Sequence, residues 1–549
     1  MADTMIQRLL TRFRGPAMDG ATRALIRFNR RKWKPQPKTD NVVLMGLFSW
    51  RPTMCAFSHA ANHFAERTGA RIEAYFFGRG MDPVVLEIYR SFGARLTLGW
   101  SSTTRHEAQA RQFADEALAA VRNSDDVFLI RFQDIVLGDL IYDSYIRYFY
   151  EATVRLDDPR LREIVEKTFL IALACEEYFA RHRVTALFPY DAPYIESGVV
   201  HRFAIRHGVP IYALEYHPFA LHAMDTAMLA GDPADHRHWP SKLPLHRFAP
   251  EIFAGLDPEQ QARGQEAARA ALARHFQGII ADKVLAQYGA PATSQGSAFS
   301  EPGSEAVFAK TGRPRMLVML HDFCDAPNVY RWALFRDFDE WLEFLLTRAA
   351  QTDFDWYVKP HPNRHYDRRM NEANDRITAE LQRRYPHVHF LSPQVSNRQI
   401  LAEGLDAMFT VFGTSAHEFA YHGVPVVTAG DNPQIDYTFN FHPRTREEYA
   451  RLIRSADRLQ IDIDRADIEK FYYLYHFHPY DRLPSGVSIL PEEWLRLPNL
   501  GQLESSTESF RHFMKTDSPA RDRKIADYID AFLAAQATAA PSSPPLVTT

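Results

Sequence analysis

Short apolar runs alternate with amphipathic stretches along the first half of the chain. Asn41–Ser49 (NVVLMGLFS) is a compact apolar run that predicts a buried strand. A helix is expected at Thr53–Thr68, ended by Gly69, and a second strand at Ala70–Phe77. Further apolar runs predict strands at Asp125–Arg131, Val184–Pro189 and Val209–Leu214. This rhythm of strand, helix and strand is typical of a parallel α/β sheet.

The second half repeats the same rhythm after a break. Residues 250–283 predict helix, and the polar stretch Gly289–Ser304 predicts an exposed linker. Strands are then expected at Arg315–Leu320, Trp356–Val358, Val388–Leu391, Ala407–Val411 and Pro425–Thr428. Helices are expected at Arg331–Ala350, Tyr366–Arg384 and Ala416–His422, the first of them with an aromatic stripe.

These patterns predict an organisation in five parts. They are a basic arm (1–40), an N-terminal Rossmann-like domain (41–300), a C-terminal Rossmann-like domain (301–500), a C-terminal helix (501–536) and a disordered tail (537–549). Two such domains in one chain predict a cleft between them. Ligands of open α/β sheets bind beyond the carboxyl ends of the strands, so chemical motifs are expected there.

Composition narrows the function classes. The chain has 549 residues with 64 basic and 68 acidic side chains, so it is no polycation of the nucleic-acid-binding kind. Its 3 cysteines contain no CxxC pair, which excludes a disulfide scaffold and a structural zinc cluster of cysteines. There is neither a P-loop motif nor a GxGxxG after a strand, so classical nucleotide triphosphatases and dehydrogenases drop out.

The basic arm predicts contact with a membrane surface. No apolar run reaches the roughly 18–20 residues of a membrane span, and the first residues lack the apolar core of a signal peptide. We therefore expect a cytoplasmic protein. Within residues 1–38 many arginines and lysines accompany Leu9, Leu10 and Trp33, a composition suited to an anionic leaflet. The alternative is a helix packed on the body of the protein.

The most specific motif is Val358–Pro362 (VKPHP), directly after a predicted strand. Two prolines bracket His361 and make the turn rigid. Lys359 and His361 at the carboxyl end of a strand suit a phosphate or diphosphate group. The alternative is a surface turn without a ligand.

A second motif is Phe412–His422 (FGTSAHEFAYH), between a predicted strand and a predicted helix. Gly413 permits a tight turn, and Thr414 and Ser415 offer hydroxyls and backbone N–H groups to an anion. Glu418 is placed to accept hydrogen bonds from ribose hydroxyls. Ser415 and Glu418 also match a capping box, which is the structural alternative.

Together, KPHP, GTS-x-x-E and the later G-x-PV turn resemble the donor half of GT-B glycosyltransferases, over roughly residues 310–435. The pattern is most similar to bacterial capsule and surface-polysaccharide transferases of the Kdo-transferase type, which use CMP-activated sugars. The resemblance implies that His361, Thr414 and Ser415 contact the donor phosphate and that Glu418 binds the ribose. The HP motif of bacterial GT-B sialyltransferases is similar, and teichoic-acid polyol-phosphate transferases resemble the chain more distantly.

Other polar side chains also follow predicted strands or share a helix face. His321 and Asp322 follow the first strand of the second domain, where a donor or acceptor group would enter. Asp139 and Asp143 are four residues apart in GDLIYDSYIR, on one predicted helix face, where they could orient acceptor hydroxyls or supply a base. Asp191 is a further candidate base. Glu196 and His217 are similarly placed.

No metal or resident cofactor is predicted. Three DxD strings, which in other glycosyltransferases hold a metal, begin at Asp337, Asp353 and Asp462. None follows a convincing strand, so all three are interpreted as surface charge, with the first inside the aromatic-striped helix.

The sequence therefore predicts a GT-B glycosyltransferase that is independent of metal. The donor would be a CMP-linked acidic sugar such as Kdo. The enzyme would transfer this sugar to a bacterial surface polysaccharide or to a lipid-linked glycan. The alternatives are a CDP-polyol phosphotransferase, a nucleotide-sugar epimerase and a non-catalytic glycan-assembly protein.

Overall fold

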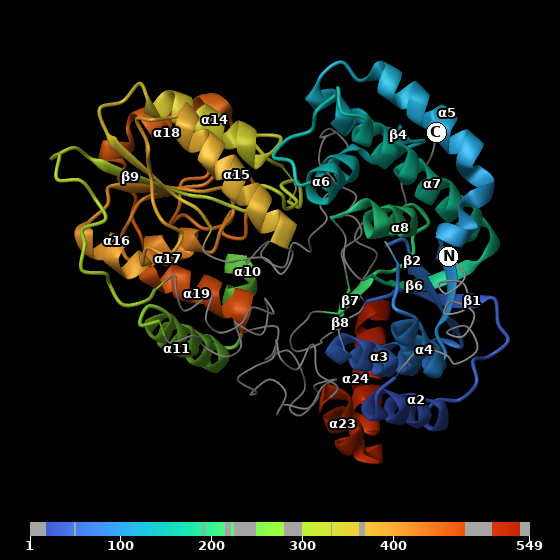
Figure 1. The fold of residues 1–549 in the computed structure, drawn as a ribbon. Coiled ribbons are helices and arrows are strands. Elements are labelled where there is room, and N and C mark those ends of the chain that lie inside the picture. Colours follow the sequence, from blue (N-terminus) through green and yellow to red (C-terminus); the bar gives the residue numbers. More distant parts are fainter. Residues whose placement is uncertain are drawn as a thin grey trace.

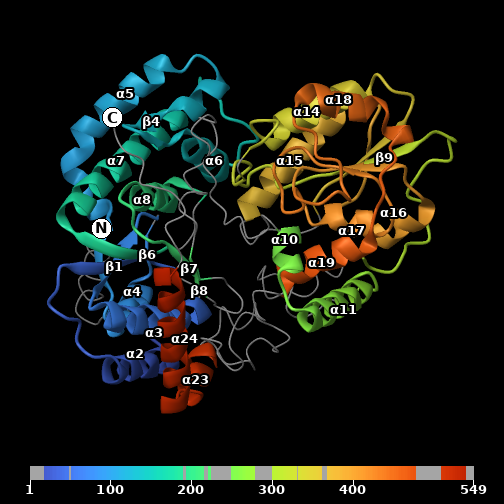
Figure 2. The ribbon, with the colours of Figure 1, turned by 180° about the vertical axis from the view of Figure 1, so that it is seen from behind.

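The computed structural model describes residues 18–48, 51–78, 80–189, 193–214, 221–223, 249–278, 299–330, 332–361, 368–477 and 508–538. Two α/β units lie side by side, coloured blue to green and yellow to orange in Figure 1. Each contains a parallel sheet with helices on both faces, and the view from behind shows the same division (Figure 2).

The N-terminal sheet has four parallel strands in the order β3-β2-β1-β6. They are β1 (Asn41–Gly46), β2 (Arg71–Phe76), β3 (Arg95–Gly99) and β6 (Arg183–Phe188). Two short antiparallel pairs accompany it, β4 (Arg131–Phe132) with β5 (Ile135–Val136) and β7 (Tyr212–Leu214) with β8 (Leu221–Ala223). The helices are α2 (Gly20–Lys32), α3 (Arg51–Thr68), α4 (Pro83–Ser91), α5 (Glu107–Ala120), α6 (Gly138–Phe149), α7 (Pro159–Arg181) and α8 (Ile195–Arg206).

The C-terminal sheet has five parallel strands in the order β11-β10-β9-β12-β13. They are β9 (Arg315–Met319), β10 (Asp355–Lys359), β11 (His389–Phe390), β12 (Ala407–Phe409) and β13 (Val426–Val427). The helices around it are α10 (Ala249–Ala254), α11 (Pro258–His275), α14 (Phe338–Ala349), α15 (Arg368–Arg384), α16 (Asn397–Glu403), α17 (Ser415–Tyr421), α18 (Arg446–Arg454) and α19 (Arg465–His476).

The order of the strands in both sheets is Rossmann-like. Each unit runs outward from its first strand to the second and third, and then returns to the other side of the first. In the C-terminal unit the direction therefore reverses between β9 and β12, which is where ligands of such sheets bind. The predicted α/β fold class with two Rossmann-like units is confirmed.

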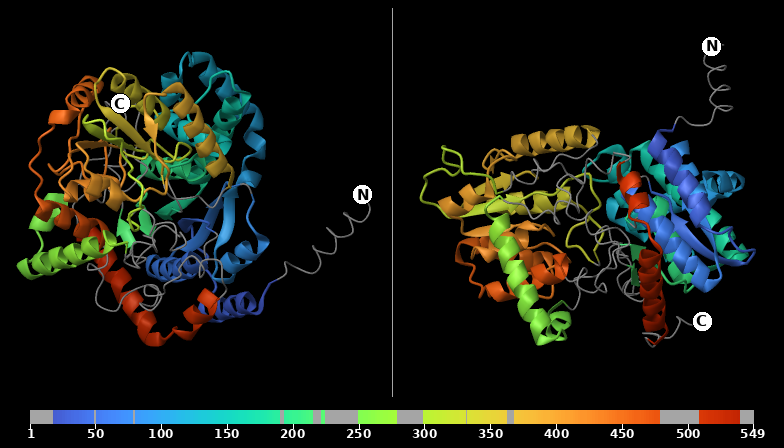
Figure 3. Two further views of the ribbon diagram at one scale, coloured as in Figure 1. Left: turned by 60° about the vertical axis from the view of Figure 1, so that its left-hand side comes forward. Right: turned by 90° about the horizontal axis from the view of Figure 1, so that it is seen from below.

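The C-terminal unit begins earlier than residue 300, the domain boundary expected from the sequence. Both α10 and α11 pack on α19 of the C-terminal unit, and Figure 3 shows α11 alongside that unit. Gly264 permits this, because a Cβ there would lie 2.7 Å from the ring of Tyr473. Arg269 and Gln265 both bond to Glu469 across the same contact.

The chain returns to the N-terminal unit at its C-terminal end. The expected single helix over 501–536 is two helices where it is described, α23 (Glu508–Lys515) and α24 (Pro519–Thr538), and both pack on α3. Phe510, Phe513, Ile525 and Ile529 are each at most 1% exposed in the core of the N-terminal unit. The tail beyond residue 538 lies outside the described residues.

The described part of the basic arm is a helix packed on the body. In α2, Leu25 is 1% and Ile26 6% exposed, and Asn29 donates to Ser91 of α4 at 3.0 Å. Trp33, expected to face a membrane, is 9% exposed. The arm is therefore no free extension from residue 20 onward, and Leu9 and Leu10 lie outside the described residues.

Two predicted elements are wrong in type or extent. The expected strand at 125–131 is mainly a 3-10 helix, Ser124–Leu129, because the Asn123 side chain caps the N–H groups of Asp125 and Asp126. The helix expected from Arg331 begins only at Phe338, because Asp337 caps it by accepting from the Glu340 N–H at 2.7 Å.

Candidate functional site

The predicted site residue His321 meets the Phe412–His422 motif at the point where the strand order reverses. His321 follows β9, and its Nε2 accepts a hydrogen bond from the Phe412 N–H, beyond β12, at 3.2 Å. The imidazole stacks on Phe338 with ring centroids 4.8 Å apart. Since Nε2 is an acceptor here, the neutral ring carries its proton on Nδ1.

Lys359 occupies the last position of β10 and is fully buried, at 0% exposure. Its Nζ has no hydrogen-bond partner among the described residues. Burial lowers the pKa of Lys359 to about 8, although the charge of Glu418 opposes this shift. A buried ammonium in this state is costly, and an anionic group within reach would relieve the cost.

Glu418, on α17, is 8% exposed and contacts a residue that sequence reasoning missed. His275 Nε2 lies 3.1 Å from Glu418 Oε1, and it comes from α11, 143 residues earlier in the chain. Burial by itself would raise the pKa of the Glu418 carboxyl, but His275 and the charge of Lys359 hold it below its usual range. The Glu418 side chain is therefore a carboxylate anion, and it lies in the helix that follows β12.

The capping-box alternative for Ser415 and Glu418 is wrong. The helix is capped by Thr414, which makes no side-chain capping hydrogen bond. Gly413 sits in a crowded turn, where a Cβ would lie 3.2 Å from Ser415 Oγ and 3.5 Å from the His321 ring. The turn thus packs directly against His321, and a side chain at position 413 would need Ser415 to shift slightly.

His361 and Asp322 are placed at the margins of this region. His361 is exposed. Asp322 accepts from Asn374 Nδ2 at 2.7 Å and from the Cys324 N–H at 3.0 Å. Burial raises the pKa of Asp322 to about 6. Asp322 therefore holds the loop after β9 through these hydrogen bonds.

Asp139 is enclosed within the N-terminal unit. It is 1% exposed, and its two oxygens accept from Nη1 and Nη2 of Arg202, which is itself 2% exposed. Arg202 also bonds the Val136 carbonyl at 2.6 Å. Both oxygens of Asp139 are thus engaged in a buried ion pair that fastens α6 to α8.

Asp143 joins the two units. It is 2% exposed, and it accepts from the backbone N–H of Asn328 at 3.2 Å and from its Nδ2 at 2.8 Å. Burial raises the pKa of Asp143 well above its usual range, although the bonds from Asn328 oppose this. Tyr142, the preceding residue, donates to Asp337 of the other unit. Helix α6, which lies between the units in Figure 1, is therefore an interface helix.

The interpretation of the first DxD string as surface charge within a helix is wrong. Asp337 is 2% exposed, caps α14 and accepts from Tyr142. A group with metal-ligand spacing, His59, Asp517 and Asp522, lies on the N-terminal unit instead.

Some predicted residues and one cavity lie apart from the site. Asp191 and His217 fall outside the described residues. Glu196 accepts from Tyr148. A cavity of about 570 Å³ opens between α5 and α7, with Phe113 and Phe169 in its wall, and no predicted site residue lines it.

Comparison with known proteins yields similarity only to solved structures. No protein-family model matches the chain, and no curated protein does. The UDP-GlcNAc 2-epimerase of Methanocaldococcus jannaschii is 9% identical, with a TM-score of 0.28, over 80% of this chain and 99% of that one. KpsC of Thermosulfurimonas dismutans, a beta Kdo 2,4 transferase, is 14% identical, with a TM-score of 0.28, over 53% and 78%. A glycosyltransferase of Rickettsia africae is 10% identical, with a TM-score of 0.25, over 87% and 99%. At such values these likenesses say nothing about which reaction this chain performs.

Proposed function

We propose that the chain is a glycosyltransferase whose C-terminal unit binds a nucleotide-activated sugar beyond the carboxyl ends of its strands. The observation that carries this proposal is Lys359, a buried ammonium without a hydrogen-bond partner among the described residues, at the end of β10. It lies in the motif that resembles the phosphate-binding HP motif of GT-B enzymes. A diphosphate or phosphodiester oxygen is the group that would compensate this charge.

The proposed division of labour follows from the placement of the other side chains. Lys359 and His361 would neutralise the charge that develops on the leaving phosphate, the largest electrostatic change in such a reaction. His321 fixes the backbone at Phe412, and the Gly413–Ser415 turn would approach the phosphate. Glu418, oriented by His275, would accept from the ribose hydroxyls.

The donor proposed is CMP-linked, carrying an acidic sugar such as Kdo, and the acceptor a bacterial surface polysaccharide or a lipid-linked glycan. Both rest on the resemblance of KPHP and GTS-x-x-E to CMP-sugar enzymes. For the catalytic base we retain Asp191. Asp139 and Asp143 are not proposed for this role, because buried partners already engage their oxygens.

The test is direct binding of nucleotides to the full chain. Calorimetry with CMP, CDP, UDP and GDP should show CMP or CDP binding most tightly. Lys359→Met should weaken this binding, whereas Lys470→Met, in the same unit but paired with Asp467 at 2.7 Å, should not. Binding of UDP alone would refute the CMP donor, and equal affinity in Lys359→Met would refute the site.

A nucleotide-sugar epimerase is the second candidate, since such an enzyme needs no acceptor. The observation that favours it is the enclosure of Asp139 and Asp143, which removes two predicted acceptor-side carboxylates. Incubation with a nucleotide sugar alone separates the two functions. An epimerase would change the sugar without an acceptor, a transferase would not, and a polyol phosphotransferase would release a polyol phosphate.

We further propose peripheral attachment to the inner face of the cytoplasmic membrane. No helix among the described residues is long and apolar enough to cross a bilayer. Arg23, Arg27 and Arg31 are exposed at intervals of four residues along α2, on the face turned away from the body, and form a basic stripe. Each such charge near an anionic leaflet contributes about 1 kcal/mol at low salt.

A further inference from the structure

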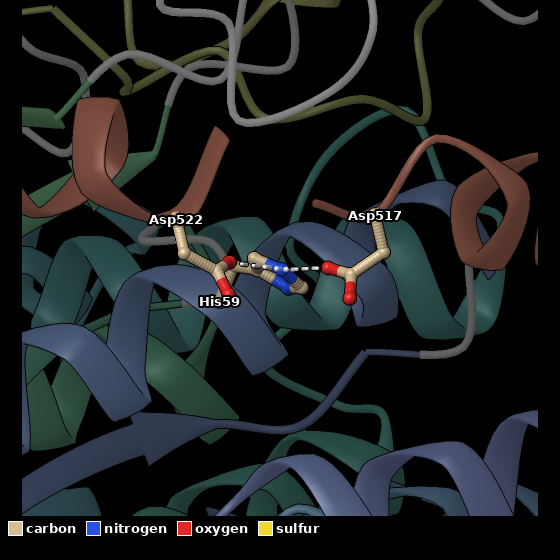
Figure 4. Close-up of side chains that lie close together, drawn as sticks. All are labelled: His59, Asp517 and Asp522. Atoms are coloured by element: carbon tan, nitrogen blue, oxygen red, sulfur yellow. Dashed lines mark ion pairs between the residues drawn. The ribbon is translucent and has the colours of Figure 1, made fainter. Parts of the chain in front are cut away.

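Two histidines on one face of α3 point at two carboxylates of the C-terminal helices. His59 and His63 are four residues apart, so both lie on the same side of the helix. His59 Nε2 lies 3.6 Å from both Asp517 Oδ1 and Asp522 Oδ1. His63 Nε2 lies 3.8 Å from Asp522 Oδ1. Figure 4 shows the His59 ring between the two carboxylates.

Both imidazoles are buried, and each has a nitrogen atom that makes no hydrogen bond to the part of the chain that the structure describes. His59 is 0% and His63 7% exposed, and Nε2 of each has no hydrogen-bond partner among the described residues. Such orphaned polar atoms are rare in folded proteins and call for a ligand or ion.

The spacing of these atoms suits a metal ion. A tetrahedral zinc site with bonds of about 2.0–2.1 Å places neighbouring ligand atoms about 3.3–3.4 Å apart. The observed separations of 3.6, 3.6 and 3.8 Å are about 0.2–0.5 Å longer than these values. The ligand atoms of His59, Asp517 and Asp522 all lie within 4.8 Å of one another, and His63 adds a fourth beside Asp522. Imidazole nitrogen and carboxylate oxygen are ligands that zinc and other divalent transition metals share.

Lys32 is the competing cation. Its Nζ bonds Asp517 Oδ1 at 2.5 Å and Asp522 Oδ1 at 2.8 Å, the same oxygens that face His59. One ammonium balances only one of the two carboxylates, whereas a divalent ion bound to neutral imidazoles balances both. The Lys32 side chain is 11% exposed and also lies over the rings of Phe28 and Trp33, so an ion that binds here must displace it from these contacts.

We propose that His59, His63, Asp517 and Asp522 form a binding site for one divalent transition-metal ion of the zinc class, which displaces Lys32. The ion would tie α3 to the junction of α23 and α24. It would thus hold the returning C-terminal helices on the N-terminal unit, far from the proposed nucleotide site. This role is structural, and it does not depend on which reaction the chain performs.

The test uses the full chain, stripped of metal with a chelator, and zinc chloride as the probe. Calorimetry should show one zinc ion per chain, and thermal unfolding should shift upward as zinc increases. His59→Gln with His63→Gln should weaken binding by about tenfold or more. Lys32→Met should bind zinc about tenfold more tightly. His106→Gln, a histidine of the same unit paired with Glu177, should bind as the wild type does.

Cobalt provides a second readout that does not depend on stability. A site with nitrogen and oxygen ligands in tetrahedral geometry gives visible absorption bands, which should disappear in the histidine variants. If the double variant fails to fold, as judged by circular dichroism, His63→Gln alone serves, since His63 lies at the edge of the cluster. Absence of zinc binding in the wild type overturns the proposal. Binding only by Lys32→Met also overturns it, because Lys32 is then the resident cation.

Discussion

Replacing Lys359 by methionine should stabilise the folded protein and at the same time weaken its binding of nucleotides. The pKa of this lysine falls from an ordinary value of 10.5 to about 8 because burial disfavours its charged form. At 1.36 kcal/mol for each pKa unit, the fold loses about 3 kcal/mol by keeping the ammonium buried at neutral pH. Methionine has a similar shape and no charge, so Lys359→Met should gain about 2–3 kcal/mol at pH 7.

The stability difference between Lys359→Met and the wild type should depend on pH. Below about pH 8 the lysine is protonated in both the folded and the unfolded chain, and the full cost is present. Between about pH 8 and 10.5 the folded protein loses this proton first, so the cost shrinks as pH rises. The stability gap between Lys359→Met and the wild type should therefore be largest at pH 7 and nearly vanish at pH 10.5.

The assay is urea unfolding of both proteins at pH 7 and near pH 10, followed by tryptophan fluorescence. Differences between the two proteins at each pH cancel the other groups that titrate. Lys470→Met is the matched control and should stay within about 0.5 kcal/mol of the wild type. A Lys359→Met protein that is less stable than the wild type at pH 7, or a gap that does not narrow, would refute the reasoning.

The same charge predicts a proton linkage to the ligand. An anionic phosphate beside Lys359 favours the ammonium, so nucleotide binding at about pH 8.5 should take up a proton. Calorimetry in two buffers of different ionisation enthalpy measures this uptake. Lys359→Met should bind weakly and without proton uptake.

Four other changes test separate parts of the structure. Asp139→Asn weakens a buried ion pair with Arg202 and should lower the free energy of unfolding in urea by about 3–5 kcal/mol. A variant with wild-type stability but no turnover would instead indicate that Asp139 is the catalytic base. His361→Ala should leave stability within about 0.5 kcal/mol, because the side chain is exposed, yet lower nucleotide affinity in calorimetry; unchanged affinity would exclude His361 from the site. Glu418→Gln should weaken nucleotide binding by about 1–2 kcal/mol, and a variant that binds normally would limit Glu418 to pairing with His275. Replacing the three arginines of the basic stripe by glutamates should reduce co-sedimentation with anionic vesicles, and added salt should reduce it in the wild type. The control replaces three exposed arginines of α15 in the same way. An equal loss of co-sedimentation in the control would contradict a specific role of the stripe.

Most strands of both sheets could be predicted because buried parallel strands are continuous apolar runs, but β3 (Arg95–Gly99) was missed, because its first two residues are exposed and its sequence is no such run. NVVLMG and RMLVM lie within the strands expected from them, as β1 and β9. The same logic placed the KPHP and GTS strings at strand ends, where the structure has Lys359 and the Gly413 turn. The local sequence pattern was enough to place these motifs, because a strand and the residues that follow it are neighbours in the chain.

Partners from distant segments could not be predicted in this way. Two aspartates four residues apart on α6 have the pattern of a solvent or active-site face. Only the fold reveals that Arg202, 63 residues onward, and Asn328, 185 residues onward, meet them inside the protein. His275 escaped notice for the same reason, because nothing in the alanine-rich helix that carries it marks a contact with Glu418.

The return of α23 and α24 makes the C-terminal unit an insertion within the N-terminal one. The described residues of the C-terminal unit all lie between positions 249 and 477, whereas those of the first unit come from two segments on either side of that range. A cut after α19 would strip Phe510, Phe513, Ile525 and Ile529 from the first unit and expose its apolar surface to aggregation. Of the two, therefore, the C-terminal unit is the one whose described elements come from a single stretch of the chain, whereas the core of the N-terminal unit needs two separate segments.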